Sequence, residues 1–172
     1  MERVAGLYKV SLQRFIEDYR EATGDLTTSE TDLNVMYEAI RLPLRATAGS
    51  AGYDFFLPYP IALAPGEGCR IVTGIRAEIV QGWVLMTYPK SGLGFRFRLQ
   101  LDNTVGVIDS DYFYSDNEGH IMARLTNDSR AGKTVELAAG KAFMQGIFTP
   151  FGITRDDAAT GIRNGGFGST EK

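Results

Sequence analysis

Cysteine and histidine are almost absent from this chain of 172 residues, which contains one of each, Cys69 and His120. A zinc site needs three or four ligands, so a Cys/His zinc site within one chain is excluded by count. Cys69 has no second cysteine to pair with, and the first residues lack the apolar core and cleavage pattern of a secretory signal, which predicts a cytoplasmic location. His120 follows Glu118 and Gly119 in a polar stretch, so we expect a solvated histidine in an exposed turn rather than the base of a Ser-His-Asp triad.

The chain also lacks a long apolar run and an excess of positive charge. No segment approaches the roughly 20 apolar residues that a membrane-spanning helix needs, so no membrane partner is expected. Its 18 basic and 21 acidic residues give a net charge of −3, which leaves no broad basic surface for nucleic acid. With 44% hydrophobic and 23% charged residues, the composition is that of a globular protein. The length predicts a single domain over residues 1–172.

Helical periodicity is confined to the N-terminal part of the chain. Gly24 and Asp25 supply a C-cap and a turn between two amphipathic stripes, which begin behind Ser11 and behind Thr28 and Ser29. The two stripes are Leu12, Phe15, Ile16, Tyr19 and Leu33, Met36, Tyr37, Ile40. We therefore expect a hairpin of two helices over about residues 11–41, packed against the rest of the domain.

After Pro43 the periodicity changes to two. Apolar and polar residues alternate at 75–79 and at 95–101, and further short strands are predicted at 83–88, 120–126, 134–137 and 142–148. Gly, Pro, Asn and Asp residues separate these segments, and no helical pattern intervenes. Many short strands in this arrangement are typical of a β-barrel or a jelly roll, so the predicted fold is mainly β.

Three polar segments are candidates for chemistry. Residues 102–111 carry three aspartates, although a run of this kind is usually a solvated turn. Lys90, Ser91 and Gly92 follow a predicted strand and offer a cation, a hydroxyl and free amides, although an ordinary turn fits them equally well. Residues 163–172 are rich in glycine and hydroxyls and have no apolar periodicity. Together these segments supply the groups that a magnesium–triphosphate needs.

In their order and spacing, five segments between about residue 42 and residue 170 resemble the motifs of the trimeric dUTP diphosphatase (dUTPase) family. They are Ala48–Asp54 (AGSAGYD), Pro89–Gly94 (PKSGLG), Asn103–Tyr112 (NTVGVIDSDY), Gly140–Gln145 (GKAFMQ) and Arg163–Thr170 (RNGGFGST). The third match is nearly letter for letter. The resemblance implies a distorted jelly-roll or β-barrel fold of the dUTPase-like type, with the helical hairpin as an N-terminal insertion.

The resemblance implies roles for residues of a phosphate site. Asp54 would hold water around a Mg²⁺ ion whose direct ligands are largely phosphate oxygens. Lys90, Ser91, Gly92 and Gln145 would contact the phosphates. Lys90 stands where the family usually has arginine; it keeps the positive charge but lacks the bidentate fork.

For the nucleoside, the resemblance implies a β-hairpin over Asn103–Tyr112. Tyr112 would pack on the deoxyribose where a 2′-hydroxyl would clash, and Asp109 would orient the attacking water. The residues that would read the uracil edge, largely through the backbone, are Asn103, Gly106, Val107 and Ile108. After Tyr112 the family soon reaches a glycine, whereas here Phe113–Glu118 intervene, so we expect a longer loop.

The C-terminal segment, about residues 160–172, resembles the mobile tail that closes over substrate in the family. In that tail an arginine and a Ser/Thr pair meet phosphates, and a phenylalanine stacks on uracil. The tail residues that would bind substrate here are Arg163, Phe167, Gly168, Ser169 and Thr170.

The activity that the resemblance implies is Mg²⁺-dependent hydrolysis of dUTP to dUMP and pyrophosphate, by attack of water on the α-phosphorus. This reaction limits uracil incorporation into DNA and supplies dUMP for dTMP synthesis. The resemblance also implies a homotrimer with active sites shared between subunits. Two alternatives stay open: a dCTP deaminase of the same superfamily, which would need a catalytic glutamate such as Glu118, and a nucleotide-binding regulatory module without turnover.

Overall fold

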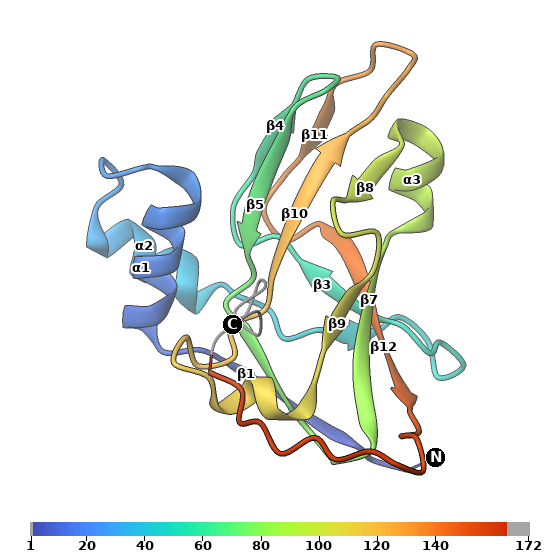
Figure 1. The fold of residues 1–172 in the computed structure, drawn as a ribbon. Helices are drawn as coiled ribbons and strands as arrows, with labels where there is room; N and C mark the ends of the chain where they lie inside the picture. The colour runs from blue at the N-terminus through green and yellow to red at the C-terminus, as the bar shows by residue number, and fades with distance from the viewer. Residues whose placement is uncertain (1, 165–172) are drawn as a thin grey trace.

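The computed structural model describes residues 2–164, and their arrangement is mainly β (Figure 1). The elements in chain order are β1 (Ala5–Lys9), α1 (Leu12–Thr23), α2 (Glu30–Glu38), β2 (Leu44–Arg45), β3 (Tyr53–Phe56), β4 (Ile61–Leu63), β5 (Gly68–Val72), β6 (Ile75–Ile79), β7 (Trp83–Pro89), α3 (Ser91–Phe97), β8 (Leu99–Leu101), β9 (Gly106–Ile108), the 3₁₀ helix η1 (Ser110–Tyr114), β10 (Met122–Asn127), β11 (Val135–Leu137) and β12 (Ala142–Pro150). None of the helices in this described range is long and apolar enough to cross a membrane.

The strands form antiparallel sheets of different sizes. The largest has the order β2-β3-β12-β7-β9, a second has the order β5-β10-β8, and β1 with β6 and β4 with β11 form two-stranded ladders. The prediction of a mainly β fold is therefore confirmed. The sheets are hydrogen-bonded separately, however, so the strands of residues 2–164 do not close into a continuous barrel.

The two N-terminal helices lie where the apolar stripes predict them. The side chain of Ser11 accepts a hydrogen bond from the Arg14 amide at the start of α1, and the side chain of Ser29 accepts one from the Asp32 amide at the start of α2. These bonds satisfy amides that have no partner within the helix. Gly24 ends α1 in the left-handed conformation, with φ of 68°, as a C-cap glycine does.

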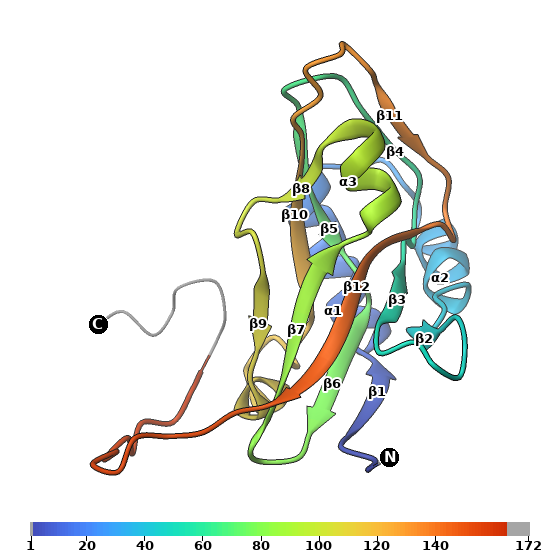
Figure 2. The same cartoon turned by 90° about the vertical axis from the view of Figure 1, so that its right-hand side faces the viewer.

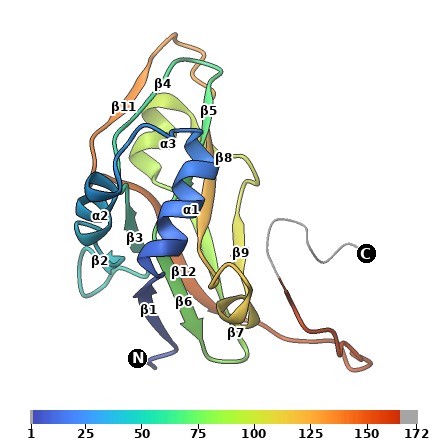
Figure 3. The same ribbon diagram turned by 90° about the vertical axis from the view of Figure 1, so that its left-hand side faces the viewer.

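The helices cover one side of the strands and contribute to the same core. Figure 3 shows α1 in front of the strands, whereas Figure 2, from the opposite side, shows β7, β9 and β12 in front of it. Phe15 of α1 and Leu33 of α2 are fully buried in one apolar cluster with strand residues such as Ile71 and Phe143. The helical hairpin is therefore packed into the core rather than attached to its surface.

The predicted strand over residues 95–101 is wrong in its first part. Residues 91–97 form the short helix α3, and the strand β8 begins only at Leu99. Both edges of the preceding strand, β7, are already paired with β12 and β9, so β7 offers this segment no edge. The segment instead bonds to itself, with the Arg98 amide donating to the Gly94 carbonyl at 2.8 Å.

The expectation of a solvated His120 is also wrong, because this side chain is fully buried. Its Nδ1 lies 2.5 Å from Oδ2 of Asp18, and its Nε2 accepts a hydrogen bond from the Gly74 amide at 2.7 Å. Asp18 precedes His120 by 102 residues and belongs to α1. The polar neighbours of His120 in the sequence therefore carried no information about its partner.

Replacing Phe15 with alanine tests how firmly α1 is docked. We expect Phe15→Ala to lower the free energy of unfolding by about 3–5 kcal/mol, since it removes a buried ring and leaves a cavity. Phe95→Ala is the matched control, because Phe95 is 91% exposed on α3, and it should change stability by less than about 0.5 kcal/mol. Equal denaturation midpoints for the two variants in urea would contradict the packing of α1 into the core.

Candidate active site

The segment Asn103–Tyr112 joins two sheets instead of forming the predicted hairpin. The strands β8 and β9 flank a turn, but β8 pairs with β10 and β9 pairs with β7. The hairpin prediction is therefore wrong in its pairing, because each strand found its partner in a different sheet. Since the two strands do not bond to each other, a space opens between β9 and β10.

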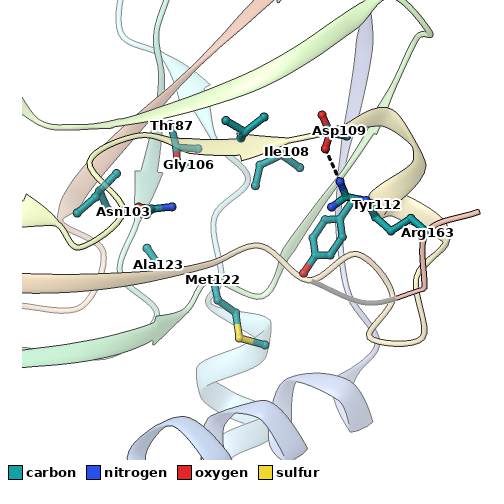
Figure 4. Close-up of a pocket in the computed structure, with 11 residues that line it drawn as sticks. Thr87, Asn103, Gly106, Ile108, Asp109, Tyr112, Met122, Ala123 and Arg163 are labelled. Atoms are coloured by element: carbon teal, nitrogen blue, oxygen red, sulfur yellow. Dashed lines mark hydrogen bonds and ion pairs between the residues drawn. The ribbon is translucent and has the colours of Figure 1, made fainter. Parts of the chain in front are cut away.

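This space is a pocket of about 320 Å³, close to the lower end of the range for small-molecule sites. Figure 4 shows its residues, which come from β7, β8, β9, β10, the turn before β9, the 3₁₀ helix η1 and the C-terminal segment that carries Arg163. Five of the residues predicted to bind nucleoside line it together with Asp109, namely Asn103, Gly106, Val107, Ile108 and Tyr112. The structure thus brings together residues that the third motif had suggested.

Other lining residues had no signal in the sequence. Thr87 belongs to β7, and Met122 and Ala123 belong to β10. These strands carry no motif at those positions, and only sheet pairing brings them to the pocket. Gly106 shows how close the pairing is, because a side chain there would collide with the hydroxyl of Thr87 on the neighbouring strand.

Arg163 lies across the mouth of the pocket. From β12 the chain runs without helix or strand through residues 151–164 back towards η1 (Figure 1). There Nη2 of Arg163 lies 2.5 Å from Oδ2 of Asp109, and its Nε lies 3.1 Å from Oδ1 of Asp111. The Arg163 side chain is 22% exposed, and its guanidinium lies 5.9 Å from the centroid of the Tyr112 ring. One cation therefore faces two carboxylates beside the pocket, and Figure 4 shows its contact with Asp109.

Two hydrogen bonds hold the hydroxyl of Tyr112 in place. The Tyr112 hydroxyl donates to the carbonyl of His120 at 2.8 Å and accepts from the Asn117 side-chain amide at 2.7 Å. Burial raises the pKa of Tyr112, so the phenol keeps the proton that it donates. The ring is 5% exposed and forms part of the pocket wall.

The residues predicted to bind phosphate form a second group at another place. Asp54 of β3 lies opposite Gln145 of β12 in the sheet, and its Oδ1 is 2.6 Å from Nζ of Lys90. Ser91 and Gly92 follow Lys90 as the first residues of α3. Gln145 in turn lies opposite Tyr88 of β7. All five predicted phosphate and metal residues therefore gather near one end of β7 and β12.

The two groups do not share one pocket within this chain. None of the five residues predicted to bind phosphate or metal lines the pocket of about 320 Å³. In the sheet order, β3 is three strands away from β9, so strand spacing alone puts Asp54 and Asp109 at least about 15 Å apart. The predicted tail residues Phe167, Gly168, Ser169 and Thr170 lie outside the described residues.

The segment Phe113–Glu118 is folded against β6 and against the start of α1. The Arg76 guanidinium donates to the carbonyl of Phe113 at 2.6 Å and stacks 3.7 Å from the centroid of its ring. The carboxylate of Glu118 accepts from the amide and the hydroxyl of Ser11, at 2.8 and 2.6 Å. This segment therefore links the pocket to the start of α1; a loop longer than the family's stays a prediction.

Comparison with known proteins identifies relatives for most of the chain. The dUTPase family model matches residues 38–171. The deoxyuridine 5'-triphosphate nucleotidohydrolase of Lactococcus lactis is 40% identical over 134 residues, which are 76% of this chain and 88% of the relative. The structure of dUTPase from Streptococcus mutans is 38% identical with a TM-score of 0.59, covering 66% of this chain and 88% of that chain.

A more distant structure has the same fold. The dUTPase of phage phi11 of S. aureus is 21% identical with a TM-score of 0.57, covering 70% of this chain and 90% of that chain. That structure describes the coordination of a structural Mg(II) ion in the phage enzyme. The dUTPase-like fold predicted from the motifs is thus confirmed, and residues 1–37 lie outside the matched family region.

The bond between Glu118 and Ser11 predicts a pH dependence of stability. Burial would raise the pKa of Glu118, but the hydrogen bonds from Ser11 and the charges of Arg76 and Arg14 outweigh it and lower the pKa below its usual 4.5. A carboxyl group with a lowered pKa in the fold stabilises it above the unfolded value, and this contribution is lost as the pH falls through the folded value.

We therefore expect Glu118→Gln to melt about 2 °C below the parent protein at pH 7. The difference should shrink as the pH falls below 4.5, where the parental carboxylate also begins to take up a proton. Thermal melts of both proteins between pH 7 and pH 3.5 measure it. A difference that stays constant over this range would contradict a charged Glu118 in the bond to Ser11.

Proposed function

The chain belongs to the dUTPase family, and we propose that it hydrolyses dUTP to dUMP and pyrophosphate by attack of water on the α-phosphorus. The observation that carries this proposal is the pocket formed by Asn103–Tyr112, with the Asp109 carboxylate at its mouth. Its physiological effect would be to limit uracil incorporation into DNA and to supply dUMP for dTMP synthesis.

The pocket has the polar groups needed to distinguish one base from another. Asn103 can donate and accept hydrogen bonds through one amide, which suits the alternating donor and acceptor groups on the edge of uracil. Gly106, Val107 and Ile108 would add backbone groups from β9. Tyr112, held by two hydrogen bonds, would form the wall against the deoxyribose and exclude a ribose by contact with its 2′-hydroxyl.

Asp109 would be the catalytic residue. As a carboxylate it can accept a hydrogen bond from water and direct that water at the α-phosphorus, while pyrophosphate leaves on the opposite side. Its ion pair with Arg163 holds that cation at the mouth of the pocket. Arg163 would turn to the phosphates when substrate binds, and this would free Asp109 for water.

The residues predicted to bind phosphate and metal fit a substrate that carries its own Mg²⁺. No cluster of three or more His, Cys, Asp or Glu residues within 2–164 could hold a metal ion by protein ligands alone, whereas Asp54 offers a carboxylate that could accept hydrogen bonds from metal-bound water. Mg²⁺ binds few carboxylates and keeps waters and substrate phosphates as ligands. When bound, it would neutralise charge on the phosphates. Lys90, Ser91, Gly92 and Gln145 would hold those phosphates.

The separation of the two groups supports a homotrimer with shared sites. If Asp54 and Asp109 of one chain lie on the order of 15 Å apart, they cannot both act on one α-phosphorus and its neighbours. A second copy of the chain that presents its phosphate-binding residues to the nucleoside pocket would complete the site. We propose that residues 1–172 act as one dUTPase-like domain in such a trimer, with Phe167, Gly168, Ser169 and Thr170 as further contacts to substrate.

Two further aspects of the proposal follow from the chemistry of the chain. The free Cys69 supports a reducing, cytoplasmic location, and burial raises the pKa of its thiol to about 11, which keeps it unreactive. A deaminase would need Glu118 near the base. The carboxylate of Glu118 instead binds Ser11, and Glu118 does not line the pocket, so the deaminase alternative has no support here.

Asp109→Asn tests the role of the carboxylate. We expect a loss of turnover of about 100-fold or more, because asparagine keeps the shape but cannot act as a base towards water. Pyrophosphate release from dUTP with Mg²⁺ measures it, and dUTP binding measured by calorimetry should persist. Parental turnover in the variant would remove Asp109 from the mechanism, and a parental protein without turnover would favour the regulatory module.

Mixed trimers test the sharing of sites between subunits. Asp109→Asn and Gln145→Ala should each be inactive as pure proteins. After complete subunit exchange at equal amounts, about one quarter of the sites would combine an intact Asp109 with an intact Gln145 from the neighbouring chain. We therefore expect about one quarter of the parental turnover. A mixture that stays as inactive as its components would show that both residues must come from one chain.

A further inference from the structure

The part of the chain outside the matched dUTPase region reaches the nucleoside pocket through the segment that follows Tyr112. Residues 1–37 precede the matched region, and they include β1 and α1. Residues 113–120 follow Tyr112 and lie beside the start of α1 (Figure 3). Ser11 of the first segment binds Glu118 of the second, and Asp18 of the first binds His120 of the second. A segment outside the matched region thus binds the segment that follows Tyr112.

The contact between Asp18 and His120 has a defined hydrogen-bond direction. The Gly74 amide donates to Nε2 of His120 at 2.7 Å, so Nε2 is an acceptor and carries no proton. The proton of a neutral imidazole is then on Nδ1, which donates to Oδ2 of Asp18 at 2.5 Å. Asp18 is 4% exposed and also lies 3.4 Å from Nη1 of Arg14. Each nitrogen of the buried ring therefore has a partner, and the ring has one orientation.

His120 passes this orientation to Tyr112 through its backbone. Its carbonyl accepts the hydrogen bond from the Tyr112 hydroxyl at 2.8 Å. The preceding residue, Gly119, has φ of 66° and packs so closely that a Cβ there would lie 2.7 Å from the carbonyl oxygen of Tyr112. A displacement of residues 119–120 would therefore move both the hydroxyl partner and the backbone of Tyr112.

We propose that Asp18 and His120 are positioning residues for Tyr112, so that helix α1 sets the discrimination between deoxyribose and ribose. The inference rests on the proposed role of Tyr112 as the wall against the sugar. Exclusion by contact requires a wall that does not yield, because a shift of a fraction of an ångström makes room for a hydroxyl group. The buried Asp18–His120 contact supplies that rigidity from outside the pocket.

Asp18→Ala tests the inference through the ratio of kcat/KM for UTP to kcat/KM for dUTP. We expect this ratio to rise about tenfold, because the Tyr112 ring loses its fixed place. The kcat for dUTP should stay within about twofold of the parental value, since the substitution leaves Asp109 and the phosphate-binding residues unchanged. Asp18→Asn should restore the parental ratio, because the asparagine carbonyl can still accept the proton from Nδ1. Glu17→Ala, an exposed neighbour on α1 that pairs with Arg14, is the control and should keep the parental ratio.

Two more variants separate the possible failures. Tyr112→Ala should raise the same ratio by at least as much as Asp18→Ala; if it does not, the proposed role of Tyr112 is wrong. If Tyr112→Ala raises the ratio but a folded Asp18→Ala keeps the parental value, the positioning inference is overturned. Should Asp18→Ala fail to fold, Glu118→Ala replaces it, since it cuts the surface bond to Ser11 and should raise the ratio about threefold. An unchanged ratio in that folded variant would overturn the claim that the docking of α1 against residues 113–120 sets the position of Tyr112.

Discussion

Strand β7 is hydrogen-bonded along both of its edges, to β12 on one and to β9 on the other. Both groups of candidate site residues depend on this double pairing. Through β12 and β3 it places Gln145 and Asp54 near one end of the sheet, and through β9 it places Asp109 beside the pocket. Because strand spacing is nearly constant, the distance between the groups is set by the sheet and not by flexible loops. Neither group can approach the other unless backbone hydrogen bonds break.

The N-terminal helices add a second constraint on the same pocket. Taking the carboxylate of Asp18 and the ring of His120 out of water is costly unless each polar atom has a partner. Here Gly74 and Arg14 provide the partners that the pair itself does not. A helix docked in another register would leave a buried charge unpaired, so this contact selects one position for α1. That position also fixes the loop that follows Tyr112.

The charges of the site are already matched in this structure. Lys90 pairs with Asp54, and Arg163 pairs with Asp109. A triphosphate carries more negative charge than either carboxylate and would compete for both cations. The same exchange would free one carboxylate for metal-bound water and the other for the attacking water. Substrate binding and the preparation of these two carboxylates would thus be coupled by electrostatics alone.

The sequence by itself determined what depends on neighbouring residues: two capped helices, short strands, and five ordered motifs that identify the family and most of the pocket. Predictions from the sequence were wrong where the structure depends on a partner that is distant along the chain. Phe95 alternates with its neighbours as in a strand, but β7 offers it no free edge. His120 has polar neighbours but is buried against Asp18. The hairpin expected at Asn103–Tyr112 does not form, because β8 and β9 pair with strands of different sheets. Only the tertiary structure decided these points, because pairing and burial depend on hydrogen-bond partners that folding brings together, and spacing along the chain does not specify them.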